Sequence, residues 1–216
     1  MKYKTLSFFA KYSDEKITPN ELLSSQYIST ENMLPDKGGI TGATALPKVQ
    51  QIKSFKKNDI LISNIRPYFK KIWKASFDGG CSNDVLIIRT LPEYDSTFLY
   101  YALSSDNFFS FATKTAKGTK MPRGDKQVIL NYKIPFFTRN EQEKIGSILS
   151  NIDQKIHTNK RINDNLQQQA QVLFKEWFID NSDAPLWRKG TFSDLIEKTV
   201  SGDWGKDTPS LNNTEM

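Results

Sequence analysis

The side chains that most often carry out enzymatic chemistry are few in this 216-residue chain, which has one histidine and one cysteine. His157 lies in a polar stretch without cysteines or clustered carboxylates at the spacing of metal ligands, so we expect no metal site there. A Ser-His-Asp or Cys-His nucleophile would have to use the same histidine. We therefore predict no catalytic residue, no metal and no cofactor.

One short motif could suggest an enzyme. The stretch NIRPYF (64–69) is similar to the Asn-Pro-Pro-Tyr/Phe motif with which adenine methyltransferases hold a flipped base. Its second and third positions are Ile65 and Arg66, and the glycine doublets at 38–39 and 79–80 lack the spacing of a phosphate-binding loop. We interpret the stretch as a strand end and turn. A minimal adenine methyltransferase stays an alternative, which cofactor binding by the isolated chain would test.

Basic residues point to a different chemistry, because they gather at two places. One group surrounds NIRPYF among aromatic residues, and the other crowds a loop with two glycines. Lys and Arg on exposed loops neutralise phosphates, and Arg, Ser and Thr can read base edges in a major groove. Each residue alone could be a solvated charge, but the clustering favours DNA binding. The predicted DNA-binding residues are Arg66, Tyr68, Lys70, Lys71, Lys74, Lys114, Lys117, Thr119, Lys120 and Arg123.

The net charge is unevenly distributed along the chain. Residues 1–140 have 21 Lys+Arg against 12 Asp+Glu, a net of +9, whereas residues 141–216 have 9 against 12, a net of −3. This distribution is expected where one module meets a polyanion and another does not. The single cysteine, Cys81, and the lack of a signal-peptide pattern or a long apolar run predict a soluble cytoplasmic protein without a membrane segment.

Residues 1–140 are predicted to form one mixed α+β domain with several short strands. β-Branched runs that follow Asn-Asp indicate strands, and apolar residues at helical spacing indicate a helix. The expected elements are strands at 58–66 and 83–90, a turn at Gly79-Gly80, a helix at 95–112, a loop at 114–126 and an edge strand at 132–137.

Residues 141–180 predict one long helix, with Asn140 as the expected N-cap. Forty residues at 1.5 Å each would span about 60 Å. Apolar residues repeat every seven positions and form a narrow stripe, which is typical of a two-helix coiled-coil seam. Asn159 lies in the same column and is expected to set the register.

The stripe has no second heptad segment to pair with in the sequence, so we predict that another chain covers it. The alternative is a helix that lies across its own domain. The predicted dimerisation residues are Ile145, Leu149, Ile152, Ile156, Asn159, Ile162, Leu166 and Leu173. Beyond the helix, residues 181–216 are expected to form a linker and then a short helix over 193–200.

Three stretches, taken in order, resemble a type I restriction-modification specificity subunit. They are YISTENMLP, DILISNIRPYFKKIWKASFDGGCSNDVLIIR, and YKIPFFTRNEQEKIGSILSNIDQKI followed by QVLFKEWF. The resemblance runs from near the start to about residue 180. It implies that 1–140 is a DNA target-recognition domain, that 141–180 is a spacer helix, and that the tail is similar to the truncated start of a second recognition domain.

Such subunits do no chemistry themselves, and usually contain two recognition domains, each followed by a long helix, with the helices antiparallel. The resemblance therefore implies a half-subunit that forms a homodimer by antiparallel helix pairing. Its expected partners are double-stranded DNA, DNA methyltransferase (modification) subunits and, through them, the restriction subunit, with a bipartite target. The alternative is a remnant that binds methyltransferase subunits without recognising DNA.

Overall fold

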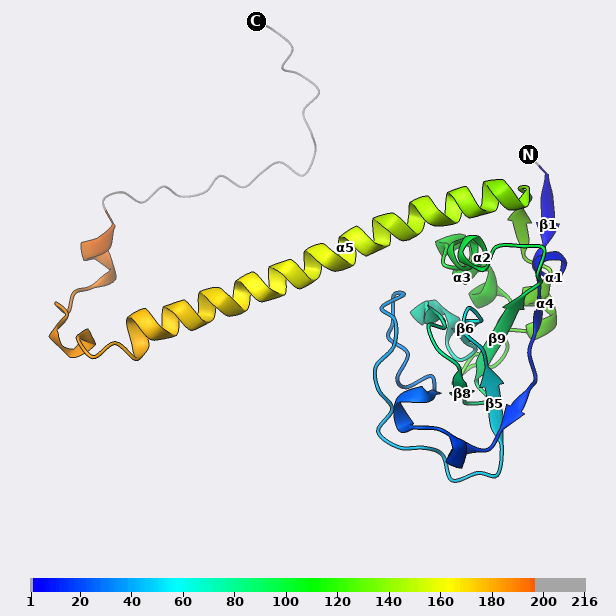
Figure 1. Ribbon diagram of the computed structural model, residues 1–216, viewed down its shortest axis with the longest axis horizontal. Helices are drawn as coiled ribbons and strands as arrows, with labels where there is room; N and C mark the ends of the chain where they lie inside the picture. Colours follow the sequence, from blue (N-terminus) through cyan, green and yellow to red (C-terminus); the bar gives the residue numbers. More distant parts are fainter. Residues whose placement is uncertain (1, 197–216) are drawn as a thin grey trace, which may run out of the picture. The chain divides into compact units, whose positions relative to one another are not determined.

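The computed structural model describes residues 2–196 (Figure 1). The chain divides into two units, Met1–Asn159 and Lys160–Met216. The predicted mixed α+β fold with several short strands and a long helix is confirmed. The strands are β1 (Tyr3–Thr5), β2 (Ala10–Tyr12), β3 (Lys16–Ile17), β4 (Tyr27–Ile28), β5 (Ile52–Phe55), β6 (Ile60–Ser63), β7 (Ile72–Lys74), β8 (Gly79–Cys81), β9 (Val85–Thr90) and β10 (Lys133–Pro135). The α-helices are α1 (Leu6–Phe9), α2 (Ser96–Leu103), α3 (Asp106–Lys114), α4 (Lys126–Leu130) and α5 (Arg139–Phe174).

Two four-stranded sheets and one two-stranded sheet make up the β structure of the described residues. The first is antiparallel throughout, with the order β2-β9-β6-β7, and its centre is formed by the two predicted β-branched runs. The second has the order β3-β5-β8-β4, in which β4 runs parallel to β8. β1 and β10 form the third sheet, so the predicted edge strand at 132–137 is confirmed.

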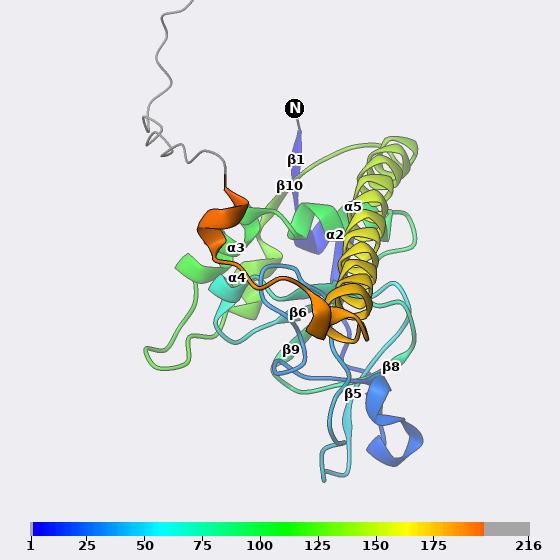
Figure 2. The same cartoon turned by 90° about the vertical axis from the view of Figure 1, so that its left-hand side faces the viewer.

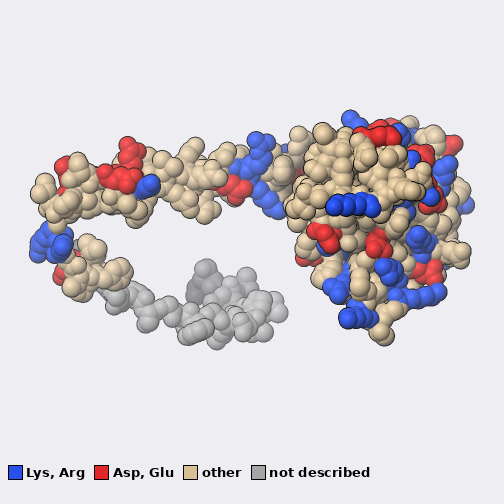
Figure 3. Space-filling model, turned by 90° about the horizontal axis from the view of Figure 1, so that it is seen from below, with Lys and Arg blue, Asp and Glu red and all other residues tan. Residues whose placement is uncertain are grey.

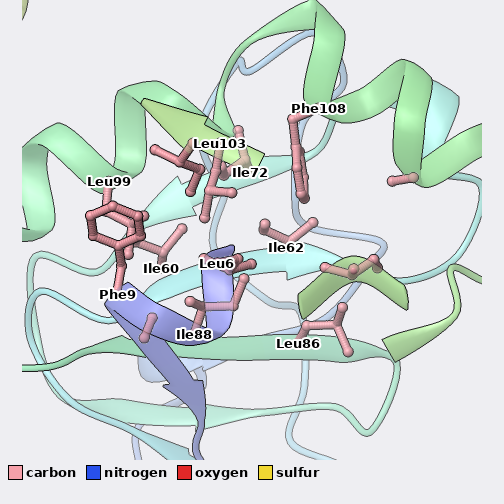
Figure 4. Packing of buried hydrophobic residues seen from close by; sticks show 14 of the residues in the cluster. Leu6, Phe9, Ile60, Ile62, Ile72, Leu86, Ile88, Leu99, Leu103 and Phe108 are labelled. Atoms are coloured by element: carbon pink, nitrogen blue, oxygen red, sulfur yellow. The ribbon is translucent and has the colours of Figure 1, made fainter. Parts of the chain in front are cut away.

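The central sheet is buried on both faces, because successive residues of a strand point to opposite sides. Ile60 and Ile62 of β6 join one apolar cluster, to which the helices α1 to α4 also contribute side chains (Figures 1, 2 and 4). Leu61 of the same strand joins a second cluster, which packs on Phe55 and Cys81 of the other sheet. The domain therefore has three layers: the helices, the central sheet and the second four-stranded sheet. Because both faces of the central sheet are buried, the sequences of its central strands are continuous apolar runs.

Two sequence-based predictions within the domain are wrong. The Gly79-Gly80 pair is not a turn but lies in β8, where a Cβ on Gly80 would come within 2.7 Å of a Leu22 methyl group. The predicted helix over 95–112 is two helices, because the Ser105 hydroxyl accepts a hydrogen bond from the Phe108 amide and caps a new helix after Leu103. Apolar spacing alone does not show such an internal cap.

The long helix is present but begins earlier than predicted. α5 starts at Arg139, so Asn140 is inside the helix and is not the N-cap. The Glu141 carboxylate instead accepts hydrogen bonds from the Thr138 amide and hydroxyl at 2.8 and 2.7 Å. This is a capping-box contact, which satisfies groups at the helix start.

After Phe174 a π-helical turn spans Lys175–Ile179. A 3-10 turn at Phe192–Leu195 lies where a helix over 193–200 was predicted. The rest of that predicted helix, and most of the predicted start of a second recognition domain, lie outside the described residues.

Candidate nucleic-acid interface

The two basic groups of the sequence lie side by side in the structure. The first is in the connection 64–71 between β6 and β7, and the second is in the loop 115–125 between α3 and α4. The Arg66 amide donates to the Pro122 carbonyl at 2.8 Å, and the Gly124 amide donates to the Asn64 carbonyl at 3.1 Å. Two segments about fifty residues apart are thus joined by backbone hydrogen bonds.

A third segment, 34–40, which the sequence analysis missed, joins this surface. The amides of Asp36 and Lys37 donate to the carbonyls of Phe69 and Lys70 at 2.9 and 3.0 Å. The Lys37 and Lys70 ammonium groups also share one carboxylate oxygen of Asp106, at 3.2 and 3.0 Å. The hydrogen bond from Lys70 is the main reason why the pKa of Asp106 lies below its usual range. We call segments 34–40, 64–71 and 115–125 the loop surface.

The backbone of the loop surface is strained. Among the described residues, five non-glycine residues have positive φ angles, and four of them are Asp36, Lys37, Arg66 and Lys70. Such a conformation costs about 1–3 kcal/mol each and persists only where the surroundings determine it. Functional loops are the usual place for this strain. A sequence without glycine at these positions carries no signal that would reveal it.

The DNA-binding side chains predicted around NIRPYF differ in their exposure and in their hydrogen bonds. Arg66 is half-buried and its Nε has no hydrogen-bond partner, whereas Tyr68 is exposed. The Lys71 ammonium donates to the Thr30 carbonyl at 2.6 Å, and the Lys74 ammonium donates to the Thr97 hydroxyl at 2.6 Å. Burial lowers the pKa of Lys74, which lies opposite Ile60 at the far end of the hairpin from segment 64–71. The structure therefore does not bring Lys74 to the loop surface.

The side chains predicted in the second group are all exposed. Lys114 ends α3, and Thr119 and Lys120 lie in the loop that follows. The Lys117 ammonium lies 2.7 Å from a carboxylate oxygen of Asp125, and the Arg123 guanidinium lies 3.2 Å from one of Asp84. Surface pairs of this kind contribute little to stability, so a phosphate or a base edge can replace the carboxylate at small cost.

A polar cavity of about 470 Å³ adjoins the loop surface through Asp84. Its walls include Ser29, Thr30 and Thr44. The buried Asn32 links two further wall residues, since its side-chain amide donates to the carbonyls of Tyr27 and Thr41 at 2.9 and 3.0 Å. Hydroxyl, amide and carboxylate groups at this position provide both donors and acceptors of the kind that read base edges. Figure 3 shows basic side chains recurring over the globular part, with acidic side chains between them.

The one cysteine and the one histidine of the chain lie in different surroundings. Burial raises the pKa of the Cys81 thiol to about 12, so this side chain is a neutral core residue. His157 is exposed on α5. Within residues 2–196, no group of three or more His, Cys, Asp or Glu side chains is arranged to hold a metal ion. None of the helices in this range is both long and apolar enough to cross a membrane.

The predicted dimerisation stripe divides into two parts. Ile145 packs against the core cluster of its own domain, and Leu149 is also half-buried. The residues of the stripe from Ile152 onward are all exposed: Ile152, Ile156, Asn159, Ile162, Leu166 and Leu173. The first turns of α5 therefore lie on the domain, and the remaining stripe is an apolar surface with no cover in the described chain.

Comparison with known proteins places the chain in a family. Residues 4–168 match the type I restriction modification DNA specificity domain, and the chain belongs to this family. It is 29% identical over 175 residues to the type I restriction enzyme HindI specificity subunit of Haemophilus influenzae, and 26% identical over 192 residues to the MjaIX specificity subunit of Methanocaldococcus jannaschii. The matches cover 76% and 87% of this chain but 35% and 42% of those relatives, so it spans less than half of their length.

Solved structures show the same fold. The HsdS subunit from Thermoanaerobacter tengcongensis has a TM-score of 0.59 at 21% identity, covering 81% of this chain and 47% of that one. The type I system S subunit from M. genitalium has a TM-score of 0.56 at 21% identity, covering 81% and 45%. The family membership confirms the predicted resemblance and the prediction of a DNA-recognition domain rather than an enzyme.

Proposed function

We propose that this chain recognises a DNA sequence through the loop surface and pairs with a second copy through the exposed stripe of α5. In this role it directs methyltransferase subunits, and through them a restriction subunit, to a bipartite target. The observation that carries the DNA contact is the convergence of segments 34–40, 64–71 and 115–125. These segments bring together lysines and arginines that are separated in the sequence and are held by exchangeable surface carboxylates.

Roles within the loop surface follow from side-chain chemistry. Arg123 is held by Asp84 beside a polar cavity, which suits a guanidinium that reads a base edge in the major groove. Lys120 and Thr119 are exposed on the tip of the loop, which suits contacts to phosphates. Tyr68 and Lys70 lie on the neighbouring segment and extend the contact.

The two roles predict different effects of substitution. Lys120→Ala should weaken binding to all duplexes and reduce the slope of log affinity against log salt by about one. Arg123→Ala should cost roughly 1–3 kcal/mol of discrimination and relax the target sequence at one position. Lys2→Ala removes an exposed charge that precedes β1 and lies outside the three segments of the loop surface; it is the matched control and should change neither quantity.

The test uses the chain in complex with its methyltransferase subunits. Affinity for duplex DNA is measured in rising salt, and methylated genomic sites are sequenced in cells that express no other specificity chain. Two identical recognition domains about a two-fold axis predict an inverted-repeat motif. An asymmetric motif would contradict the paired arrangement. A complex that forms without sequence-specific DNA retention would instead identify a remnant that only binds methyltransferase subunits.

A further inference from the structure

An apolar groove lies where the first turns of α5 meet the rest of the domain. It has a volume of about 400 Å³ and is lined by residues of β1, β10, α2, α3 and α5, among them Tyr3, Phe98, Tyr101, Ala102, Ile145 and Leu149. Ile145 and Leu149 are the two members of the heptad stripe that face the domain. The groove is therefore continuous with the exposed stripe of the same helix.

The walls of this groove are built rigidly. A Cβ on Gly146 would come within 2.9 Å of the Asp95 carboxylate, so α5 can approach α2 this closely only with glycine there. The buried Gln142 side chain accepts a hydrogen bond from the Asp95 amide at 3.0 Å. One turn beyond the groove, the Tyr101 hydroxyl donates to the Asp153 carboxylate at 2.8 Å. The groove is thus a preformed feature of the domain.

The other end of the helical segment carries large apolar side chains that are exposed, although the Phe178 ring also lies 5.9 Å from that of Trp187. Leu173, Phe174, Trp177 and Phe178 are all exposed. Leu173 and Trp177 are four residues apart and share one helix face, which continues the stripe of Ile152 and Leu166. Trp is suited to a groove such as this one, because it combines a large apolar ring with one N–H donor.

The stripe is symmetric about Asn159. Ile152 and Leu166 lie seven residues on either side of it, and Ile145 and Leu173 lie fourteen on either side. An antiparallel pair with its two-fold axis near Asn159 places the partner's Leu173 within about one turn of Ile145. In such a pair, the segment beside the first turns of α5 comes from the other molecule.

We infer that the groove beside Ile145 and Leu149 receives Leu173 and Trp177 of a second copy of this chain. The inference rests on the antiparallel pairing in the proposed function and adds a second contact to it. Each recognition domain is then held by both helices of the pair: its own α5 packs on one wall of the groove, and the end of the partner's helix fills the space. The orientation of the DNA-binding loops would be set by both copies.

Cross-linking tests the contact directly. One chain carries Asn107→Cys at the groove rim and another carries Glu176→Cys beside Trp177, both exposed positions. The native Cys81 is fully buried and does not react in the folded protein. A short bismaleimide should link the two chains only when they are mixed. In an antiparallel pair of identical variants, each cysteine lies far from the same cysteine of the other molecule.

A chain with Asn159→Cys is the reference, since a position on the two-fold axis links to itself. Self-linking of Asn159→Cys without linking of the mixed pair would overturn the groove contact but would still support the pairing of the helices. Failure of both would overturn the groove contact and the pairing together. A chain carrying both Asn107→Cys and Glu176→Cys that links within a monomer would show that the groove is filled by its own chain, which also overturns the inference.

Dimer affinity provides a second readout. Trp177→Ala should raise the dimer dissociation constant at least tenfold. Phe192→Ala removes an aromatic side chain that is even more exposed, at 78% against 59%, but lies outside the helix, and it should leave the constant unchanged. An unchanged constant for Trp177→Ala would also overturn the inference.

Discussion

The exposed stripe of α5 makes a quantitative prediction, which the double substitution Ile152→Asp with Leu166→Asp tests. The two side chains are 49% and 56% exposed, so about half of each remains to be buried in a pair. Full burial of Ile or Leu contributes about 1.5–3 kcal/mol, so half-burial of each contributes about 0.8–1.5 kcal/mol. The four side chains of a symmetric pair then contribute roughly 3–6 kcal/mol, equal to two to four orders of magnitude in the dissociation constant.

The assay is sedimentation equilibrium of the pure chain over a wide concentration range. The wild-type chain should associate to a dimer, and the double variant should remain a folded monomer. Gln154→Asp with Gln168→Asp is the matched control, because it adds the same charge at the same fourteen-residue spacing on exposed positions outside the stripe. A double variant that sediments like the wild type, or an effect of equal size in the control, would refute the prediction that the exposed stripe of α5 pairs two chains.

Two further predictions concern the core of the domain. Gly80→Ala should lower the free energy of unfolding by about 1–3 kcal/mol, because the new methyl group would press on the side chains of Ile52 and Leu22, whereas Gly42→Ala, with open space around it, should be nearly neutral in the same thermal unfolding experiment. Burial raises the pKa of the Cys81 thiol to about 12, above its unfolded value of about 8.5. Stability should therefore be unaffected by this group below about pH 8.5 and then fall by about 1.4 kcal/mol per pH unit towards pH 12, a slope that Cys81→Ala should lack. Equal slopes in the two chains would contradict the cause assigned to the shift.

The periodic elements were readable from the sequence, because the signals that define them are local. The β-branched runs predicted β6 and β9, and the run without proline from Glu141 predicted α5. The charge split between residues 1–140 and 141–216 led to the prediction that the first part contacts DNA, and this stays a prediction. The prediction of one helix over 95–112 was wrong at Ser105, because the hydroxyl of this residue caps a second helix and apolar spacing does not show such a cap.

The composition of the candidate sites was decided only by the tertiary structure. Backbone hydrogen bonds join segment 64–71 to both 34–40 and 115–125, and no spacing in the sequence indicates which loops will meet. The same long-range packing turned Lys74 toward Thr97 and placed Ile145 on its own domain rather than in the exposed stripe. The sequence by itself determined the strands, the long helix and the stripe, because periodicity depends on near neighbours. The loop surface and the apolar groove depend on contacts between distant residues, which only the folded chain brings together.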